Sequence, residues 1–165
     1  MTTGDSAELR ATALAMLEAT STLTLATTSA SGLPWAATVF FAADRALNLY
    51  FVSDHRTRHA RDTAAHPHAA AAINPDCDNW HAVKGIQAEG PVSIVSGLER
   101  GKALALYLRK FPQIDALYAA PADEHEATIA KRLQSANFYK LAPVRMRVID
   151  NSRGFGWRAE IEFGV

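Results

Sequence analysis

Three apolar stretches follow one another near the start of the chain, separated only by short turns. The first, Thr22–Thr28, alternates polar and apolar residues as a half-buried strand does. The second, 35–43, is apolar apart from one threonine, and Asp44-Arg45 forms a turn before the third, 47–53. Turns this short join strands that run in opposite directions, because parallel strands need a long crossover. The sequence therefore predicts an antiparallel meander.

The rest of the chain adds further strands and places helices between them. Helical patterns cover residues 5–20, 56–66, 98–111 and 123–135, and strand patterns cover residues 68–73, 81–95, 144–148 and 157–163. Glycines and Pro91 interrupt the long strand region, which indicates a bend, and Ser96 and Glu99 have the spacing of a capping box. The pattern predicts a mainly β fold, a six- to seven-stranded antiparallel split β-barrel with peripheral helices.

Composition limits the organisation and the partners of the chain. No internal repeat or low-complexity linker divides it, so a single domain over residues 1–165 is expected. Lys plus Arg and Asp plus Glu are both 17, so no net charge attracts nucleic acid or an anionic membrane. One cysteine and an N-terminus without a signal-peptide pattern indicate a cytoplasmic protein.

The segment most informative about chemistry is 49–61, where an apolar strand ends at Ser53 and runs directly into a helix. The first turns of that helix contain Arg56, Arg58 and Arg61. Cations oppose the helix dipole at this end unless an anion lies among them. Backbone N–H groups, the hydroxyls of Ser53 and Thr57, and guanidinium groups all suit a phosphate monoester. The alternative, that the arginines form only a solvated helix surface, stays open.

The order of elements and several short motifs resemble the pyridoxamine 5′-phosphate oxidase-like family, the FMN-binding split barrels, over nearly the whole chain. Residues 51–59, followed by Asp62 and His66-Pro67, are similar to the strand-to-helix element of that family, and residues 85–91 are similar to one of its barrel strands. Residues 56–59, 107–112 and 150–156 resemble small uncharacterised bacterial members.

The resemblance implies FMN as the cofactor and names the residues that would contact it. The phosphate would be held by Thr57, Arg58 and His59, and the ribityl chain would lie near Val52 and Ser53. The ring edge would face the backbone of Thr38, Val39 and Phe40, and the opposite side of the ring would be lined by Lys84 and Gly85. His59 stands where many members have lysine. No catalytic residue is implied.

The resemblance also implies an activity and a partner. We expect an FMN-dependent oxidoreductase that transfers hydride or electrons between a reduced donor such as NAD(P)H and a small acceptor, with a second copy covering the flavin in a homodimer. The chain lacks the G-x-S-x-G, H-E-x-x-H, Walker and G-x-G-x-x-G motifs, which agrees with chemistry supplied by a cofactor. Two alternatives remain, a non-catalytic module that binds FMN or haem, and a structural dimer without flavin.

Other residues were considered as metal, redox or substrate sites. His55 and His59 are four apart, and His66 and His68 follow, but no cysteine or carboxylate completes a recognisable ligand set, so no metal site is predicted. Carboxylates on both sides of Cys77 disfavour a reactive thiolate. Trp80, beside a polar loop, is the aromatic residue that best suits a substrate contact.

Overall fold

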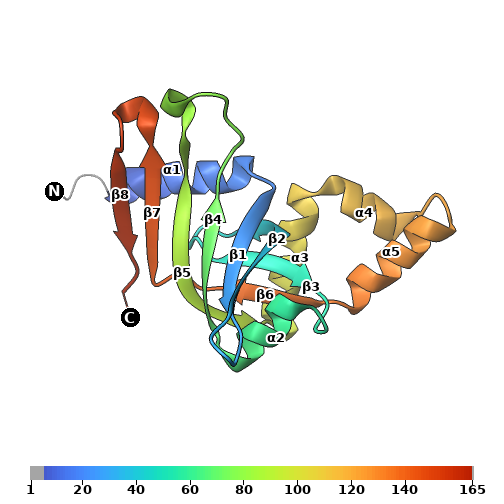
Figure 1. The fold of residues 1–165 in the computed structure, drawn as a ribbon. Helices are drawn as coiled ribbons and strands as arrows, with labels where there is room; N and C mark the ends of the chain where they lie inside the picture. The colour runs from blue at the N-terminus through green and yellow to red at the C-terminus, as the bar shows by residue number, and fades with distance from the viewer. Residues whose placement is uncertain (1–5, 165) are drawn as a thin grey trace.

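The computed structural model describes residues 6–164, which form eight strands and five α-helices (Figure 1). The strands are β1 (Thr22–Thr28), β2 (Pro34–Ala43), β3 (Leu49–Ser53), β4 (His68–Ile73), β5 (Lys84–Ile94), β6 (Asn137–Leu141), β7 (Arg145–Asp150) and β8 (Arg158–Glu162). The helices are α1 (Ser6–Ala19), α2 (Arg58–Ala65), α3 (Gly97–Lys110), α4 (Pro112–Ala119) and α5 (Glu124–Ser135), with short 3-10 turns η1 (Trp80–Ala82) and η2 (Asn151–Arg153).

Six of the strands close into a barrel. They neighbour one another in the order β4-β1-β2-β3-β6-β5, and a further pairing of β4 with β5 completes the ring. β7 pairs with β5 and β8 with β7, so these two strands extend the sheet beyond the ring. All pairings are antiparallel. The predicted mainly β split barrel with peripheral helices is confirmed.

β5 is the strand that both closes the barrel and carries the extension. Its first part pairs with β7 as far as Glu89, and its last part pairs with β6 from Val92 onward. The change of neighbour falls at Gly90, where a Cβ atom would collide with the carbonyl oxygen of Ala142. The bend predicted from the glycines and Pro91 is therefore present, and glycine permits the close approach.

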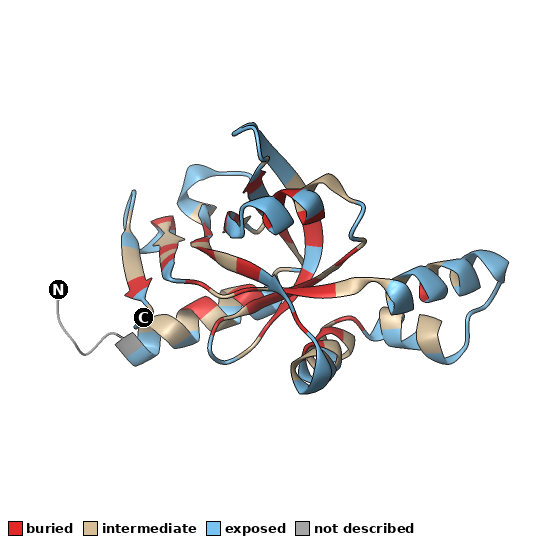
Figure 2. Ribbon diagram, turned by 90° about the horizontal axis from the view of Figure 1, so that it is seen from below, coloured by how far each residue is buried: buried red, intermediate tan, exposed pale blue. Residues whose placement is uncertain are grey.

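The buried residues form two clusters on opposite sides of the same strands. The larger cluster fills the barrel and includes Phe41 and Phe51. The smaller packs Tyr50 and Phe138 against Tyr107 of α3, outside the barrel. β2 and β3 are thus buried on both faces near their junction, which explains why the second strand is almost wholly apolar. Figure 2 shows this burial in the strands, whereas α4 and α5 project from the barrel with mostly exposed residues.

Three details differ from the sequence-based expectations. Strand β6 and helix α4 were not predicted, although both fall between predicted elements. The capping box expected at Ser96 and Glu99 does not form: Ser96 is the N-cap residue of α3, but the Glu99 carboxylate accepts from Lys140 Nζ at 2.6 Å instead. Among the described residues, no helix combines the length and hydropathy that a membrane crossing requires.

Candidate functional site

Helix α2 closes one end of the barrel, and a buried carboxylate fixes it there. The Thr27 hydroxyl of β1 donates to Asp62 Oδ2 at 2.9 Å, and both residues are buried. Arg58 Nε lies 3.7 Å from the same oxygen, one turn earlier on the helix. The Arg58 guanidinium also lies over the Trp35 ring, 4.4 Å from its centroid. Arg58 is therefore held at the start of α2 by an ion pair and a cation–π contact.

Three polar side chains meet where β3 ends and α2 begins. Ser53 Oγ lies 2.6 Å from His59 Nε2 and 3.2 Å from Thr57 Oγ1. The Thr57 hydroxyl also donates to the Asp54 carbonyl oxygen at 2.8 Å. Burial lowers the pKa of His59 below its ordinary value, which favours the neutral imidazole. We call Ser53, Thr57 and His59 the polar cluster; the sequence predicted all three.

The backbone at the start of α2 is open toward this cluster. Thr57 is the N-cap residue, yet within the described chain its side chain makes no capping hydrogen bond. The N–H groups of the first helical turn have no acceptor inside the helix, and they form the positive end of its dipole. Such an end, beside hydroxyl donors and a guanidinium, is suited to an oxyanion.

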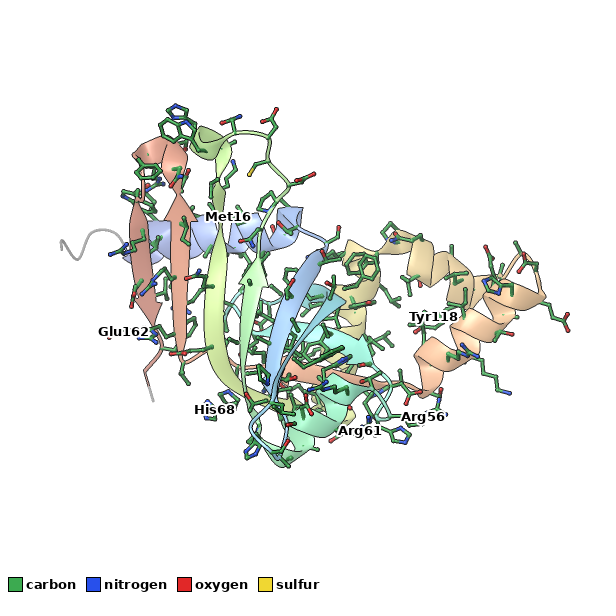
Figure 3. The ribbon with its side chains drawn as sticks, in the orientation of Figure 1. Met16, Arg56, Arg61, His68, Tyr118 and Glu162 are labelled. Atoms are coloured by element: carbon green, nitrogen blue, oxygen red, sulfur yellow. The ribbon has the colours of Figure 1, made fainter. Side chains whose placement is uncertain are left out.

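The predicted group of three arginines does not act as a unit. The Arg56 guanidinium binds the Asp54 carboxylate, with Nη2 and Oδ2 2.7 Å apart, and its side chain is 79% exposed. This pairing lowers the pKa of Asp54. Arg61, labelled in Figure 3, is exposed. It lines a separate groove with His55 and other residues. Only Arg58 is held by contacts to the barrel, so the hypothesis of a joint arginine site is reduced to one guanidinium.

The residues predicted for the ring edge lie on β2. Val39 is buried in the barrel, whereas the side chains of Thr38 and Phe40 are exposed on its outer face. In the described pairings β2 bonds to β1 along most of its length but to β3 only through Phe41–Ala43. At residues 38–40 the edge of β2 away from β1 therefore has no strand partner in the described pairings, and alternate residues there direct their backbone N–H and C=O groups to this open edge. Val52, half-buried on β3, lies next to Ser53.

Lys84 and Gly85 lie at the opposite end of the barrel from the polar cluster. The other end of β5 is next to α2, because Val92 N–H donates to the Pro67 carbonyl at 2.7 Å. Lys84 begins β5 eight residues earlier, a distance of about 26 Å along an extended strand. A Cβ atom at Gly85 would collide with the Asn74 side chain, so this glycine allows close packing there. One copy of the chain does not bring all the predicted contacts together.

The Lys84 end of the barrel has an exposed aromatic surface of its own. Trp80 is 53% exposed, stacks on His81 and makes an edge contact with Phe155, whose ring centroid is 5.5 Å away. Asn151 Nδ2 donates to the Trp80 carbonyl at 2.7 Å, which ties η1 to η2. Trp80 is therefore remote from the polar cluster of the same copy.

The histidines do not form a metal centre with other residues. In the part of the chain that the structure describes, no three His, Cys, Asp or Glu side chains gather as metal ligands. His55 is 75% exposed at its side chain and lies 3.5 Å from Asp54, while His59 belongs to the polar cluster. Cys77 is exposed.

Two residues that hold Arg58 were missed at the sequence level. Asp62 follows Arg58 by four positions on a helix, and this spacing is a signal for an ion pair that could have been used. Trp35 begins the second predicted strand, and nothing local in the sequence connects it to Arg58. The sequence also contains no signal that residues of α5 lie beside Ser53, because this contact depends on tertiary packing.

Comparison with known proteins identifies the family. The family model for pyridoxamine 5′-phosphate oxidase matches residues 9–148. The chain belongs to the pyridoxamine 5′-phosphate oxidase family. A UPF0306 protein of Klebsiella pneumoniae is 25% identical over 131 residues, which cover 76% of this chain and 78% of that protein. The family resemblance read from the sequence, including the likeness to small bacterial members, is confirmed.

Solved structures share the fold. A heme binding protein from Mycobacterium smegmatis superposes with a TM-score of 0.69 at 22% identity, covering 93% of this chain. The match spans only 56% of that longer protein. HutZ, the heme storage protein from Vibrio cholerae, gives a TM-score of 0.62 at 20% identity and covers 78% of this chain and 85% of HutZ. At these identities the comparison establishes the barrel architecture.

Proposed function

We propose that the start of α2 binds the phosphate of FMN and that the protein is an FMN-dependent oxidoreductase acting between a reduced donor such as NAD(P)H and a small acceptor. The observation that carries this proposal is the polar cluster, whose hydroxyls and imidazole meet at an open helix start beside a fixed arginine. Membership of the family supports FMN as the molecule that brings the phosphate.

The donors at this site fit a phosphate monoester. Backbone N–H groups at the start of α2 can donate to different oxygens, and the two hydroxyls and the imidazole can join them when they exchange their hydrogen bonds to one another and to the Asp54 carbonyl for bonds to the phosphate. Three oxygens need more donors than a carboxylate does. Arg58 remains able to donate, because its 3.7 Å ion pair with Asp62 is too long for a strong hydrogen bond. The contact with Trp35 limits the rotamers of Arg58, so less conformational entropy is lost on binding.

FMN, when bound, supplies hydride and electron transfer, and the chain supplies position. The open backbone edge of β2 at residues 38–40 offers N–H and C=O groups for the edge of a planar ring. Val52 and Ser53 lie between that edge and the start of α2, where the ribityl chain would run. The exposed thiol of Cys77 suits a reducing compartment such as the cytoplasm.

We infer that a second copy of the chain completes the site. The outer face of β1, β4, β5 and β7 has no helix over it in Figure 1 and carries small side chains, among them Ala26, Ala70 and Ala72. Small residues allow another surface to approach closely. A two-fold dimer would use the same patch on both copies and would let Lys84, Gly85 and Trp80 of one copy approach the cofactor of the other.

A non-catalytic module that binds haem is the second candidate, and one observation favours it. Two solved structures with this fold bear the names of heme binding and heme storage proteins. His55, on the loop before α2, is exposed and could serve as an axial ligand. The two candidates predict different spectra.

The absorption spectrum of the freshly purified protein, followed by titration of the stripped protein with FMN and with haem, tests this proposal. We expect flavin absorption bands, saturable FMN binding, and bleaching of the bound flavin by NAD(P)H. A Soret band with no FMN binding would favour the haem module. Flavin that binds but is not bleached by a reduced donor would exclude the NAD(P)H-dependent reaction.

A further inference from the structure

A cavity adjoins the polar cluster at the end of β3. It has a volume of about 490 Å³ and lies between the end of β3 and one face of α5. The two walls are adjacent because β6 begins directly after α5, and its first residue, Asn137, pairs with Ser53. The packing of β6 on β3 therefore brings the last turns of α5 to the side of the candidate cofactor site.

The lining of this cavity combines four apolar side chains with four polar ones, Ser53, Asp54, Arg56 and Arg132. Ile129 and Leu133 are one helical turn apart on α5, and Val52 lies across from them on β3. Arg132 also lines the cavity, and among the described residues no carboxylate lies within ion-pair distance of it. The nearby Asp54 does not neutralise Arg132, because both Asp54 oxygens accept from Arg56.

We propose that this cavity binds a small organic anion with an apolar body, an aromatic carboxylate being the simplest example. The anionic group pairs with Arg132, and the apolar body packs between Val52, Ile129 and Leu133. The volume lies within the range of about 300–1,000 Å³ that is usual for small-molecule sites.

The site is distinct from the phosphate site at α2. The polar cluster and Arg58 belong to α2 and the end of β3, whereas the guanidinium that serves the cavity comes from α5. The two sites share Val52 and Ser53, which the proposed function places beside the ribityl chain. The anion site is therefore adjacent to the α2 site but has a guanidinium of its own.

Titration of the full chain with benzoate, followed by ¹H–¹⁵N NMR, tests the proposal, with benzamide as a neutral probe of the same shape. We expect benzoate to shift the amide signals of residues 129–136 and 52–54, and benzamide to bind more weakly. Arg132→Gln should weaken benzoate binding on the order of tenfold, the usual scale for a lost charge-assisted hydrogen bond. It should change benzamide binding little.

Two further variants separate this site from general charge effects and from the cofactor site. Lys131 is exposed on the same helix and does not line the cavity, so Lys131→Gln should bind benzoate as the wild type does. Arg58→Ala should also bind benzoate normally, even though it is expected to lose FMN affinity. Equal weakening by Lys131→Gln and Arg132→Gln, or benzoate shifts confined to the start of α2, would overturn the proposal.

Discussion

The two ends of β5 differ in how their functional groups are held. At the Val92 end, α2 is fixed to the barrel through Asp62, and hydrogen bonds order the polar cluster before any ligand is present. At the Lys84 end, two 3-10 turns are tied together by Asn151, and large aromatic side chains stay exposed. The first end is a polar site ordered by hydrogen bonds. The second is an aromatic surface that no other described residues cover.

Lys84 and the polar cluster lie at opposite ends of β5, so the residues predicted to contact FMN do not all meet within one copy. A phosphate site benefits from rigid donors, because fixed groups lose less entropy when a ligand binds. Exposed aromatic groups next to a tight loop gain most by packing on another surface. The proposed two-fold partner would bring one end against the other.

The largest effect is expected for removal of the carboxylate that fixes α2. Asp62→Ala leaves the buried Thr27 hydroxyl without its acceptor and Arg58 without its ion-pair partner. We expect the free energy of unfolding, measured by urea denaturation, to fall by about 2–3 kcal/mol. This is less than the loss expected when one partner of a fully buried ion pair is removed, because Arg58 is partly exposed. Thr27→Val, which removes only the hydroxyl, is the milder control. A change below about 0.5 kcal/mol in Asp62→Ala would mean that α2 is held by other contacts.

A smaller effect is expected at the other end. Asn151→Ala removes the hydrogen bond to the Trp80 carbonyl and the one accepted from Gly156 N–H. The free energy of unfolding should fall by about 1–2 kcal/mol, and amide exchange should quicken at residues 80–83. If the free energy of unfolding falls as much as in Asp62→Ala, and amide exchange also quickens in α2, the two ends are not independent.

The smallest effect concerns the pH dependence of the polar cluster. Burial lowers the pKa of His59 in the folded chain below its ordinary value of 6.5, so the unfolded chain binds more protons just below that pH. The contribution of the neutral His59 to the free energy of unfolding is present above pH 6.5. It is lost as the pH falls through the pKa of His59 in the folded chain. Denaturation of the wild type and of His59→Gln between pH 7.5 and 5.5 should show a steeper loss for the wild type. If the free energy of unfolding depends on pH in the same way in both proteins, burial does not lower the pKa of His59.

The strands up to Ile73 could be predicted because their burial alternates or runs unbroken between clear turns. β6 could not, since its five residues include Phe138 and Tyr139, which are buried on opposite faces and leave no alternation. α4 is absent from the prediction because a proline after residue 111 usually marks the end of a helix, whereas Pro112 stands in the first turn of the next helix.

The candidate site was predictable where its residues are close in sequence. Ser53, Thr57 and His59 fall within one strand-to-helix segment, and the structure joins them by hydrogen bonds. Trp35 and the α5 wall come from distant segments, so only the packing of the barrel reveals them. The family resemblance implies that Lys84 belongs to the same site, whereas the structure has Lys84 at the other end of β5; a sequence pattern carries no information on which copy a residue would serve.

The measurement that tests the central claim most directly is FMN titration of two arginine variants on the same helix. Arg58 is held beside the polar cluster, whereas Arg61 is exposed on α2 and lines a different groove. Arg58→Ala should weaken FMN binding by about 1.5–3 kcal/mol, and Arg61→Ala should leave the affinity within about threefold of the wild type. Unchanged affinity in Arg58→Ala, or an equal loss in both variants, would contradict a phosphate site at the start of α2.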